Sequence, residues 1–262
     1  MSEPAGAVTI DVLLPTTAPA PWLAETLDGL NAQVGCTWRL VAVVHGDASV
    51  LTPIILAKVP TALVLPMPPE ARLQDLLNAG LAACTAPYVA RQDHDDIPEP
   101  TRLAAQRDFL DAHPSVVAVG CAATLIDEHG VVMGSRRLPV GAQVLRGLRW
   151  KSMLVHPSVM MRREPVLGAG GYDPGTTHAE DYELWLRLAA IGDLDNLEAA
   201  LLRYRVHAQQ VSRAKGIPHA TRVVVARSRR ALARARGESV IFAQLRQAVW
   251  AAPQIVRSIR RR

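Results

Sequence analysis

Short apolar runs alternate with longer stretches of helical spacing through the first half of the chain. Runs of strand type lie at 9–14, 40–44, 63–65, 88–91 and 116–120. Helical spacing lies between them at 22–33, 73–83 and 102–112. Strands that alternate with helices over this length predict an α/β fold, with a Rossmann-like, mostly parallel sheet and helices on both faces.

The second half of the chain predicts a mixed arrangement. Runs at 125–127 and 131–133 flank Glu128-His129-Gly130, which is the pattern of a hairpin with glycine at its turn. A short strand-like run covers 159–161, and helical spacing begins again near 180. Because no repeat or low-complexity linker divides the chain, we expect one continuous domain over 1–212, with parts at about 8–122 and 123–212.

Several polar side chains follow the predicted strands at their carboxyl ends. Pro15 and Thr16 follow the first strand, His45 and Asp47 follow the second, and Asp93 follows the strand at 88–91. In parallel sheets of this kind the ligand binds at the carboxyl ends of the strands. The pattern therefore places these five residues beside a bound ligand.

The strand at 88–91 leads into three carboxylates within four residues. Side chains alternate along an extended chain, so Asp93 and Asp95 are expected to point one way and His94 the other. Like charges this close repel, and two such carboxylates can share one hard divalent ion, Mg²⁺ or Mn²⁺. Such an ion also takes phosphate oxygens as ligands, which favours a nucleoside diphosphate as the second ligand. The alternative is a polar loop that leads into the next helix.

Composition narrows the classes of function. A chain of 262 residues with 49% apolar residues can bury a sizeable core, and 4% aromatic residues argue against a stacking surface for nucleic acid. Its three cysteines are far apart and odd in number, so we expect no disulfide framework or zinc site and a cytoplasmic location. The sequence contains no run of 18 apolar residues and no signal-peptide pattern, so we expect no membrane span.

The net charge of +5 is unevenly distributed. From Arg203 to the end, 15 Lys and Arg residues accompany a single acid, Glu238, so this segment carries +14 and the rest of the chain −9. Apolar residues line one side of a helical pattern at 240–249, and Pro253 is expected to break or kink it. We expect 213–262 to form a basic amphipathic helical tail suited to an anionic leaflet. Helical packing on the domain and nucleic-acid binding are the alternatives, the second weakened by the acidic body.

Three stretches, in order, resemble family 2 glycosyltransferases of the GT-A fold. They are YVARQDHDDIPEPTRLAAQ at 88–106, HPSVMMRREPVLGAGGYD at 156–173 and AEDYELWLRLAAIGDLDNL at 179–197. The resemblance implies an inverting enzyme that uses a nucleotide-sugar donor. It also implies that the part at about 8–122 binds the nucleotide and the part at 123–212 binds the acceptor.

The resemblance assigns residues to the donor and the metal ion. Asp95 becomes the closest metal ligand, with Asp93 sharing the ion or binding ribose, and His207 completing the metal shell. Imidazole suits Mn²⁺ better than Mg²⁺. The donor-binding set is Pro15, Thr16, His45, Asp47, Asn78, Arg91, Asp93 and Arg205. Asp96 is expected to be solvated rather than to support the ion from a second layer.

The resemblance also assigns the acceptor side. Asp181, in the motif Glu180-Asp181, becomes the general base that takes the proton from the acceptor hydroxyl, and Glu180 orients the acceptor or Asp181. The alternative is that both acids only complement the helix dipole. His156, Gly170 and Gly171 are expected to line the acceptor side of the pocket.

The chain departs from the family pattern in the first half. His45 stands where family members usually carry the acid that contacts the nucleotide base, so the identity of the nucleotide stays open. The sequence favours sugar transfer from a nucleotide sugar to a glycan or lipid-linked glycan, in cell-envelope or exopolysaccharide assembly. It also favours a place in the cytoplasm or at the inner face of the membrane, with no nucleic-acid partner.

Two alternatives to this function remain. The loss of the acid at position 45 suggests a catalytically silent homologue that serves as a binding or scaffold subunit. A nucleotidyltransferase also pairs a Rossmann-like half with metal-binding carboxylates. That class is expected to carry a Gly-rich loop with a basic residue after the first strand, and 15–21 has none.

Overall fold

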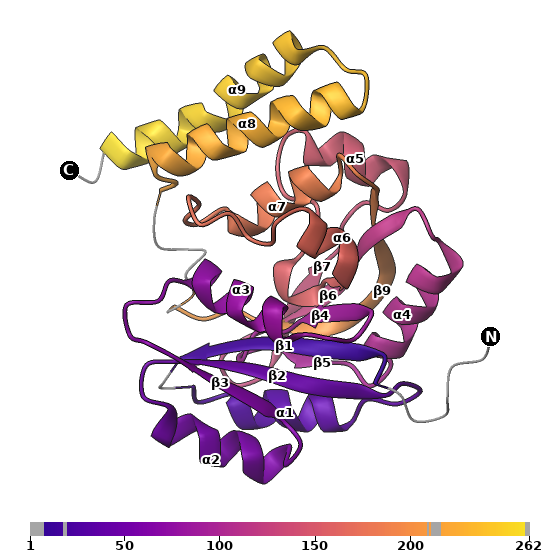
Figure 1. The fold of residues 1–262 in the computed structure, drawn as a ribbon, viewed down its shortest axis with the longest axis vertical. Helices are drawn as coiled ribbons and strands as arrows, with labels where there is room; N and C mark the ends of the chain where they lie inside the picture. Colours follow the sequence, from indigo (N-terminus) through magenta and orange to yellow (C-terminus); the bar gives the residue numbers. More distant parts are fainter. Residues whose placement is uncertain (1–7, 18–19, 209, 211–215, 260–262) are drawn as a thin grey trace.

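The computed structural model describes residues 8–17, 20–208, 210 and 216–259, and Figure 1 shows their arrangement. The strands are β1 (Ile10–Thr17), β2 (Trp38–His45), β3 (Leu63–Met67), β4 (Tyr88–Arg91), β5 (Ile97–Pro98), β6 (Val116–Ile126), β7 (Val132–Arg136), β8 (Met160–Arg162) and β9 (Asp193–Arg205). The helices are α1 (Leu23–Asn31), α2 (Ala48–Lys58), α3 (Leu73–Ala83), α4 (Arg102–Ala112), α5 (Ala142–Leu148), α6 (Arg163–Gly168), α7 (Glu180–Leu188), α8 (His219–Ala235) and α9 (Val240–Ile259), with a 3₁₀ turn, η1, at His156–Ser158.

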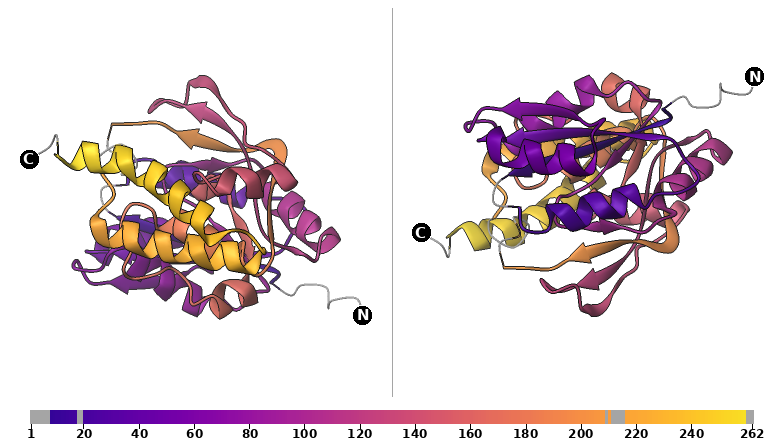
Figure 2. Two further views of the ribbon diagram at one scale, coloured as in Figure 1. Left: turned by 90° about the horizontal axis from the view of Figure 1, so that it is seen from above. Right: turned by 90° about the horizontal axis from the view of Figure 1, so that it is seen from below.

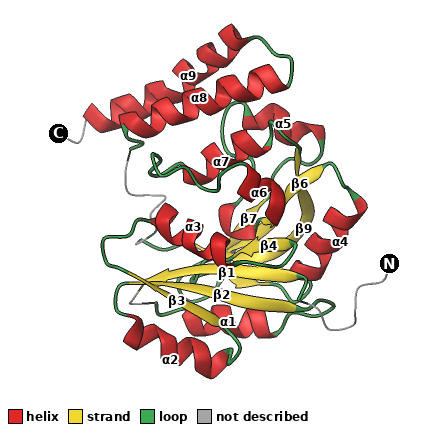
Figure 3. Ribbon diagram, viewed as in Figure 1, coloured by secondary structure: helices red, strands yellow, loops and turns green. Residues whose placement is uncertain are grey.

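The nine strands of the described residues belong to one sheet, in the order β3-β2-β1-β4-β8-β6-β9-β5, with β7 paired to β6. Figure 3 shows the strands in yellow with helices around them. Strands β3, β2, β1 and β4 run parallel, as the alternating pattern of the first half predicts. In the second half β8 runs antiparallel to β4 and β6, whereas β9 runs parallel to β6. The predicted hairpin is β6–β7. The α/β prediction is therefore confirmed, and the sheet is mixed beyond β4.

The parallel strands are buried on both faces because helices cover both faces. Leu13, Val41 and Val43 face one side, where they pack in a core that includes residues of α3 and α7. Val12 and Leu14, which alternate with Leu13, face the other side and pack in a core that includes residues of α1, α2 and α4. The helices therefore cover the two faces of the sheet, and the carboxyl ends of the strands are the edge at which a ligand can bind.

Two local predictions differ from the structure. Helix α2 was not predicted, although Asp47 begins it by accepting a hydrogen bond from the Ser49 N–H at 2.8 Å. Helix α1 begins at Leu23, with Trp22 at the cap position before it, one residue later than the helical spacing at 22–33 predicts. Trp22 is half-buried and contacts residues from the far end of the chain. Apolar spacing cannot distinguish such a long-range contact from a core contact.

The C-terminal segment forms a hairpin of α8 and α9 that packs on α7 (Figure 1). The buried face of α8 supplies Ser228, which donates to Glu183 at 2.6 Å, and Arg229, which donates to the Tyr182 hydroxyl at 2.6 Å. Helix α9 continues past Pro253, so the proline does not break it, and the expected kink stays a prediction. The expected boundary at 212 falls outside the described residues. None of the helices described here has the length and apolar character needed to cross a membrane.

Gly80 allows α3 to lie close to the sheet. A Cβ atom at Gly80 would come within 2.1 Å of Leu13 Cδ1 and 2.9 Å of Val43 Cγ2, both in the core. We expect Gly80→Ala to lower the free energy of unfolding by about 1–3 kcal/mol through overpacking, against its gain in helix propensity. Urea denaturation measures this change.

Gly168→Ala, at the end of α6, is the matched control because its Cβ would meet nothing within 4 Å. It should leave the unfolding free energy within about 0.5 kcal/mol of the wild-type value. Equal stability for both variants would contradict the packing argument.

Candidate active site

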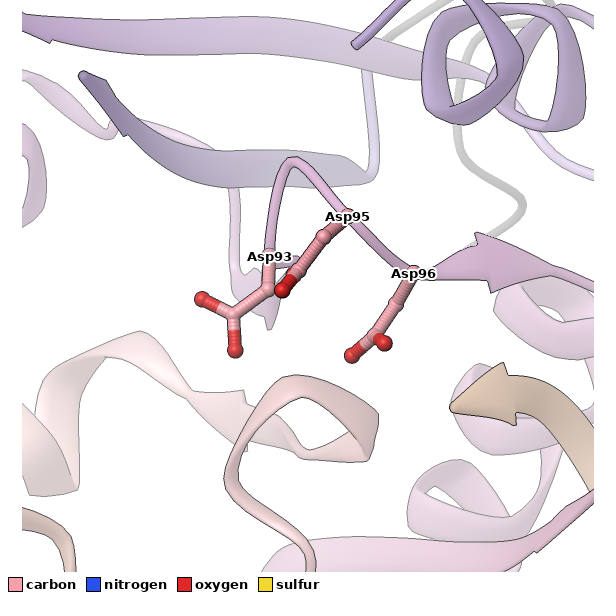
Figure 4. A group of neighbouring side chains, drawn as sticks. All are labelled: Asp93, Asp95 and Asp96. Atoms are coloured by element: carbon pink, nitrogen blue, oxygen red, sulfur yellow. The ribbon is translucent and has the colours of Figure 1, made fainter. Parts of the chain in front are cut away.

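Three carboxylates converge at the carboxyl end of β4. Asp93, Asp95 and Asp96 lie in the loop between β4 and β5, and Figure 4 shows their carboxylates directed to the same side. Their oxygens lie within 4.8 Å of one another. The loop turns at His94 and Asp95 instead of continuing as an extended strand, so the extended chain that we expected there is wrong, although Asp93 and Asp95 do point to the same side as expected. The turn adds Asp96 to the pair that the sequence predicted.

A buried network of hydrogen bonds from Gln92 and Arg102 holds the backbone of this loop. Gln92 Nε2 donates to the carbonyl oxygens of Asp93 and Asp96, both at 2.9 Å. Arg102, fully buried on α4, donates from Nη1 to Gln92 Oε1 at 2.6 Å and from Nη2 to the Arg91 carbonyl at 2.6 Å. Burial lowers the pKa of Arg102 to about 10. The loop backbone therefore has fixed partners, which keeps the carboxylates in place.

Arg205, at the end of β9, joins the acidic loop to two other elements. Its buried guanidinium donates from Nε to the Asp95 carbonyl at 3.0 Å and from Nη2 to Glu25 Oε2 at 2.7 Å. Its Nη1 lies 3.2 Å and 3.1 Å from the carbonyl oxygens of Asp127 and Glu128 in the β6–β7 turn. Arg205 lies at the site as predicted, with its guanidinium engaged by protein groups, and its expected contact with a diphosphate stays a prediction.

His207 lies against the same carboxylates. His207 Nε2 is 2.8 Å from Asp95 Oδ2, so two of the predicted metal ligands are in direct contact. Its ring lies 4.7 Å from the Trp22 ring, centroid to centroid, and Trp22 Nε1 donates to the Glu128 carbonyl at 3.0 Å. His207 Nδ1 is buried without a hydrogen-bond partner among the described residues. Trp22 thus forms a wall of the site, a role that its apolar spacing concealed.

Asp96 is buried, and the expectation that it is solvated is wrong. Its Oδ1 accepts the backbone N–H of Arg205 at 2.8 Å, whereas no described residue bonds its buried Oδ2. Burial and the charges of Asp95 and Asp93 raise the pKa of Asp96 well above its usual range. An unpartnered buried oxygen beside two further carboxylates is the arrangement that a cation would satisfy.

The environment of Asp93 shifts its pKa the other way. Burial alone would raise that pKa, but the charge of the Arg91 guanidinium outweighs burial and lowers it. Arg91 is itself buried, and its Nη2 donates to Asp93 Oδ1 at 2.5 Å. Asp93 is therefore ionised at neutral pH. Carboxylate oxygens with an adjacent imidazole are suitable ligands for a hard or intermediate divalent cation, so the residues present fit a metal ion.

The predicted base stands at the first turn of α7. Burial, and then the neighbouring charge of Glu180, raise the pKa of Asp181 to about 6. Glu180 Oε2 is buried without a partner among the described residues. The preceding His178 has a φ of 65°, the left-handed conformation that only a small fraction of residues other than glycine adopt. The backbone thus enters α7 through a constrained turn that sets the direction of the two acids.

Tyr172 lies between the two sets of acids. Its hydroxyl is 2.8 Å from His156 Nε2, and both residues are largely shielded from solvent. The charges that act on its pKa, which burial raises, come from both sides of the site: Arg91, Asp181, Glu180 and Asp93. Burial also lowers the pKa of His156 to about 3, so its imidazole is neutral. The charges of the acid cluster and of the α7 acids thus act on one residue, Tyr172, which His156 contacts. The roles of these residues on the acceptor side stay predictions.

Asn78 holds Tyr172 in position. Asn78 Nδ2 donates to the Tyr172 carbonyl at 2.8 Å, and Asn78 Oδ1 accepts the Tyr172 N–H at 2.8 Å. Gly170 and Gly171 have φ values of 86° and 65°, and a Cβ on Gly171 would lie 2.5 Å from Asn78 Oδ1. The contact with Asn78 therefore excludes a Cβ at Gly171, and the positive φ favours glycine at both positions. The expected contact of Asn78 with the nucleotide stays a prediction, since its amide already bonds the backbone of Tyr172.

The remaining donor candidates lie at the ends of β1 and β2, as predicted. His45 Nε2 is 2.9 Å from the Pro69 carbonyl, and Asp47, which is exposed, begins α2. Thr16 Oγ1 is buried and has no described partner. Pro15 lies beyond the last β1–β4 pair, so its missing N–H costs no hydrogen bond to that strand. Their contacts with a nucleotide stay predictions.

We expect Arg205→Lys to lower the free energy of unfolding by about 2–4 kcal/mol. A lysine ammonium cannot reach the three carbonyls and the carboxylate that the guanidinium contacts, so a buried cation would keep only part of its hydrogen bonds. Urea denaturation measures the change. Arg203→Lys is the control, because Arg203 lies on the same strand, half exposed, in a surface ion pair with Glu99.

That control should change stability by less than about 1 kcal/mol. Equal losses in the two variants would show that the buried contacts of Arg205 contribute no more than an exposed ion pair.

Comparison with known proteins identifies the family. The sequence model of the protein family described as "Glycosyl transferase family 2" matches residues 11–168. This range includes the three acids and His156 and ends before α7. The chain is 32% identical over 199 residues to the amylovoran biosynthesis glycosyltransferase AmsE of Erwinia amylovora, covering 74% of each chain. It is 28% identical over 149 residues to the UDP-Gal:alpha-D-GlcNAc-diphosphoundecaprenol beta-1,3-galactosyltransferase of Escherichia coli, covering 55% of this chain and 53% of that protein.

The fold matches that of a solved glycosyltransferase structure. S. aureus TarS 1-349, in complex with UDP-GlcNAc, superposes with a TM-score of 0.69 at 16% identity, over 93% of this chain and 71% of that one. At this identity the likeness shows the fold alone, whereas the family match spans more than half of the chain. The chain therefore belongs to glycosyl transferase family 2 and is a glycosyltransferase with the GT-A fold.

Proposed function

We propose that the protein transfers a sugar from a nucleotide-sugar donor to an acceptor hydroxyl, with inversion at the anomeric carbon and with the help of a divalent cation. The observation that carries the proposal is the acid cluster at the end of β4, which His207 contacts, together with Tyr172, on which the charges of Asp93 and Asp181 both act. The cluster would bind the cation that neutralises the leaving diphosphate, and Asp181 would accept the proton of the acceptor hydroxyl. The two halves of one displacement reaction are thus available in one site.

Asp93, Asp95 and His207 would hold the cation, with Asp96 completing the set through its unpartnered oxygen. A bound cation stabilises the negative charge that develops on the departing diphosphate. The imidazole of His207 favours Mn²⁺ over Mg²⁺. Arg91 supports the arrangement because it orients the Asp93 carboxylate.

Asp181 would accept the proton of the acceptor hydroxyl as that oxygen attacks. With a pKa of about 6 it is ionised at neutral pH and more basic than an ordinary aspartate. Attack from the side opposite the diphosphate inverts the anomeric centre. Glu180 contributes by raising the pKa of its neighbour, and Tyr172 and His156 shape the wall against which the acceptor rests.

The donor we propose to test first is a UDP-sugar. The E. coli relative is named for UDP-Gal and the TarS structure holds UDP-GlcNAc, which support uridine. His45, which is half-buried at the end of β2, stands beside the expected base position in place of an acid. We therefore expect weaker base selectivity than an acid at that position would give.

The acceptor we propose is a glycan or lipid-linked glycan in surface-polysaccharide assembly. The names of the two relatives, amylovoran biosynthesis and a diphosphoundecaprenol acceptor, support this class. An acceptor held in a membrane would place the enzyme at the inner face of that membrane.

Donor hydrolysis tests the proposal directly. A panel of UDP-, GDP- and dTDP-sugars is incubated with the full chain and Mn²⁺, and release of the nucleoside diphosphate is followed. The proposal expects slow hydrolysis of at least one donor that EDTA abolishes. Binding without hydrolysis or transfer would favour a silent homologue, and pyrophosphate release from a nucleoside triphosphate would favour a nucleotidyltransferase.

We expect Asp95→Asn to weaken Mn²⁺ binding in the presence of nucleoside diphosphate by about 100-fold or more, because it removes a charged ligand. Calorimetric titration measures the affinity. Asp108→Asn, an exposed acid on α4, is the control and should bind Mn²⁺ as the wild type does. Undiminished binding in Asp95→Asn would rule out Asp95 as a ligand.

We expect Asp181→Asn to slow transfer by about 10² to 10⁴ while donor binding stays the same, the usual range for a positioned base. In the wild type, kcat/KM should fall as the pH drops below about 6, because protonated Asp181 cannot accept the proton. The pH profile and the donor affinity are the measurements. A near wild-type rate, or a loss of donor binding instead, would show that Asp181 is not the general base and would make Glu180 the next candidate.

A further inference from the structure

Helix α9 carries an apolar face that nothing in the described structure covers. Ile241, Phe242, Leu245 and Val249 are 69%, 60%, 57% and 61% exposed. Their spacing places them on one side of the helix. The opposite side packs inward, where the Trp250 ring lies 5.7 Å from the Tyr182 ring, centroid to centroid. The exposed side chains are therefore a face of a well-packed helix, which we call the apolar face of α9.

Helix α8 carries a row of cations on its outer side. Arg227, Arg230 and Arg234 share one side of the helix, and none has an ion-pair partner among the described residues. The other tail arginines differ: Arg229 bonds Tyr182 and Arg236 pairs with Asp193. We call the first three the arginine row of α8. Within the described part of the tail, these three arginines are cations without an ion pair, in a segment whose sequence has a single acid.

The two faces lie together at one end of the molecule. Helices α8 and α9 contact each other, and the view from above in Figure 2 shows them uncovered on that end. The hairpin is also joined to the catalytic turn, because the Thr177 N–H donates to Thr221 Oγ1 at 2.8 Å and Thr221 Oγ1 lies 3.2 Å from the Thr177 carbonyl. Thr177 precedes Asp181 by four residues, in the bend that leads into α7. Whatever the hairpin binds is thus held in a fixed relation to the acceptor side of the site.

We propose that the apolar face of α9 and the arginine row of α8 form a docking surface for an anionic lipid bilayer. The inference rests on the proposed function, since docking would bring the Asp181 side of the pocket to a membrane-held acceptor. Apolar side chains enter the headgroup boundary while the guanidinium groups meet anionic headgroups, which is the chemistry of an interfacial amphipathic helix.

Charge complementarity selects this occupant over the others. A second copy packed face to face on α9 would bring two arginine rows together, and like charges oppose such a contact. A nucleic acid would use the arginines but gives no reason for four exposed apolar side chains. Only a lipid surface uses both features. The sequence continues past α9 with Arg260, Arg261 and Arg262, which adds to the same charge.

The test is flotation of the full chain with two kinds of vesicle. Phosphatidylglycerol–phosphatidylethanolamine vesicles are anionic, and phosphatidylcholine vesicles are zwitterionic. The wild type should bind the anionic vesicles at low salt and bind the zwitterionic ones far more weakly. Phe242→Ser with Leu245→Ser should weaken anionic binding by roughly tenfold or more. Replacing all three arginines of the row by glutamine should weaken it roughly 100-fold.

Val132→Ser with Met133→Ser is the matched control, since these residues are 65% and 54% exposed on β7 and do not belong to α8 or α9. It should bind vesicles as the wild type does. Donor hydrolysis in solution, measured on every variant, should be unchanged. The two assays test the two proposals separately. If the wild type hydrolyses a donor but does not bind vesicles, only the docking surface is contradicted. If it binds vesicles but hydrolyses no donor, only the proposed function is contradicted.

Three outcomes would overturn the proposal. The first is no binding of the wild type to either vesicle. The second is equal weakening by the β7 control. The third is a dimer in sedimentation analysis that Phe242→Ser with Leu245→Ser dissociates without any effect on vesicles, which would assign the face to a second copy.

Discussion

A single buried guanidinium, that of Arg205, sets the geometry on which the site depends. Removing a cation from water is costly unless its N–H groups find acceptors, and here the acceptors come from the acidic loop, the β6–β7 turn and α1. The same residue's backbone N–H bonds Asp96, and its chain leads directly to His207. One desolvated charge thus fixes the acid cluster and the imidazole relative to each other before any ligand arrives.

The surrounding protein gives two chemically similar carboxyl groups different pKa values. Arg91 is the main reason that the pKa of Asp93 is lowered, whereas burial and the charge of Glu180 raise that of Asp181. A lowered pKa suits a permanent cation ligand, and a pKa of about 6 suits a group that must accept a proton near neutral pH. The protein obtains this division through burial and the placement of a few charges, with Tyr172, fixed by Asn78, between the two sets.

The sequence predicted the parts of this structure that depend on local pattern. Strands, their carboxyl ends and the pairing of Asp95 with His207 followed from apolar runs and from the family resemblance. Trp22, Glu25, Arg102 and the buried state of Asp96 did not, because their roles arise from contacts between distant segments. Arg205 and Glu25 are 180 residues apart in the chain. The extended chain expected at the acids is wrong for a related reason: the loop bonds to Gln92 bend it into a turn.

The central claim is that the acid cluster holds a divalent cation together with the diphosphate of the donor. Pulsed electron paramagnetic resonance of Mn²⁺ added to the full chain, with and without UDP, tests it most directly. The account predicts a bound-ion spectrum with coupling to the imidazole nitrogen of His207 and, once UDP is added, to phosphorus nuclei. A spectrum that stays that of the aqueous ion, or bound Mn²⁺ without phosphorus coupling in the presence of UDP, would contradict it.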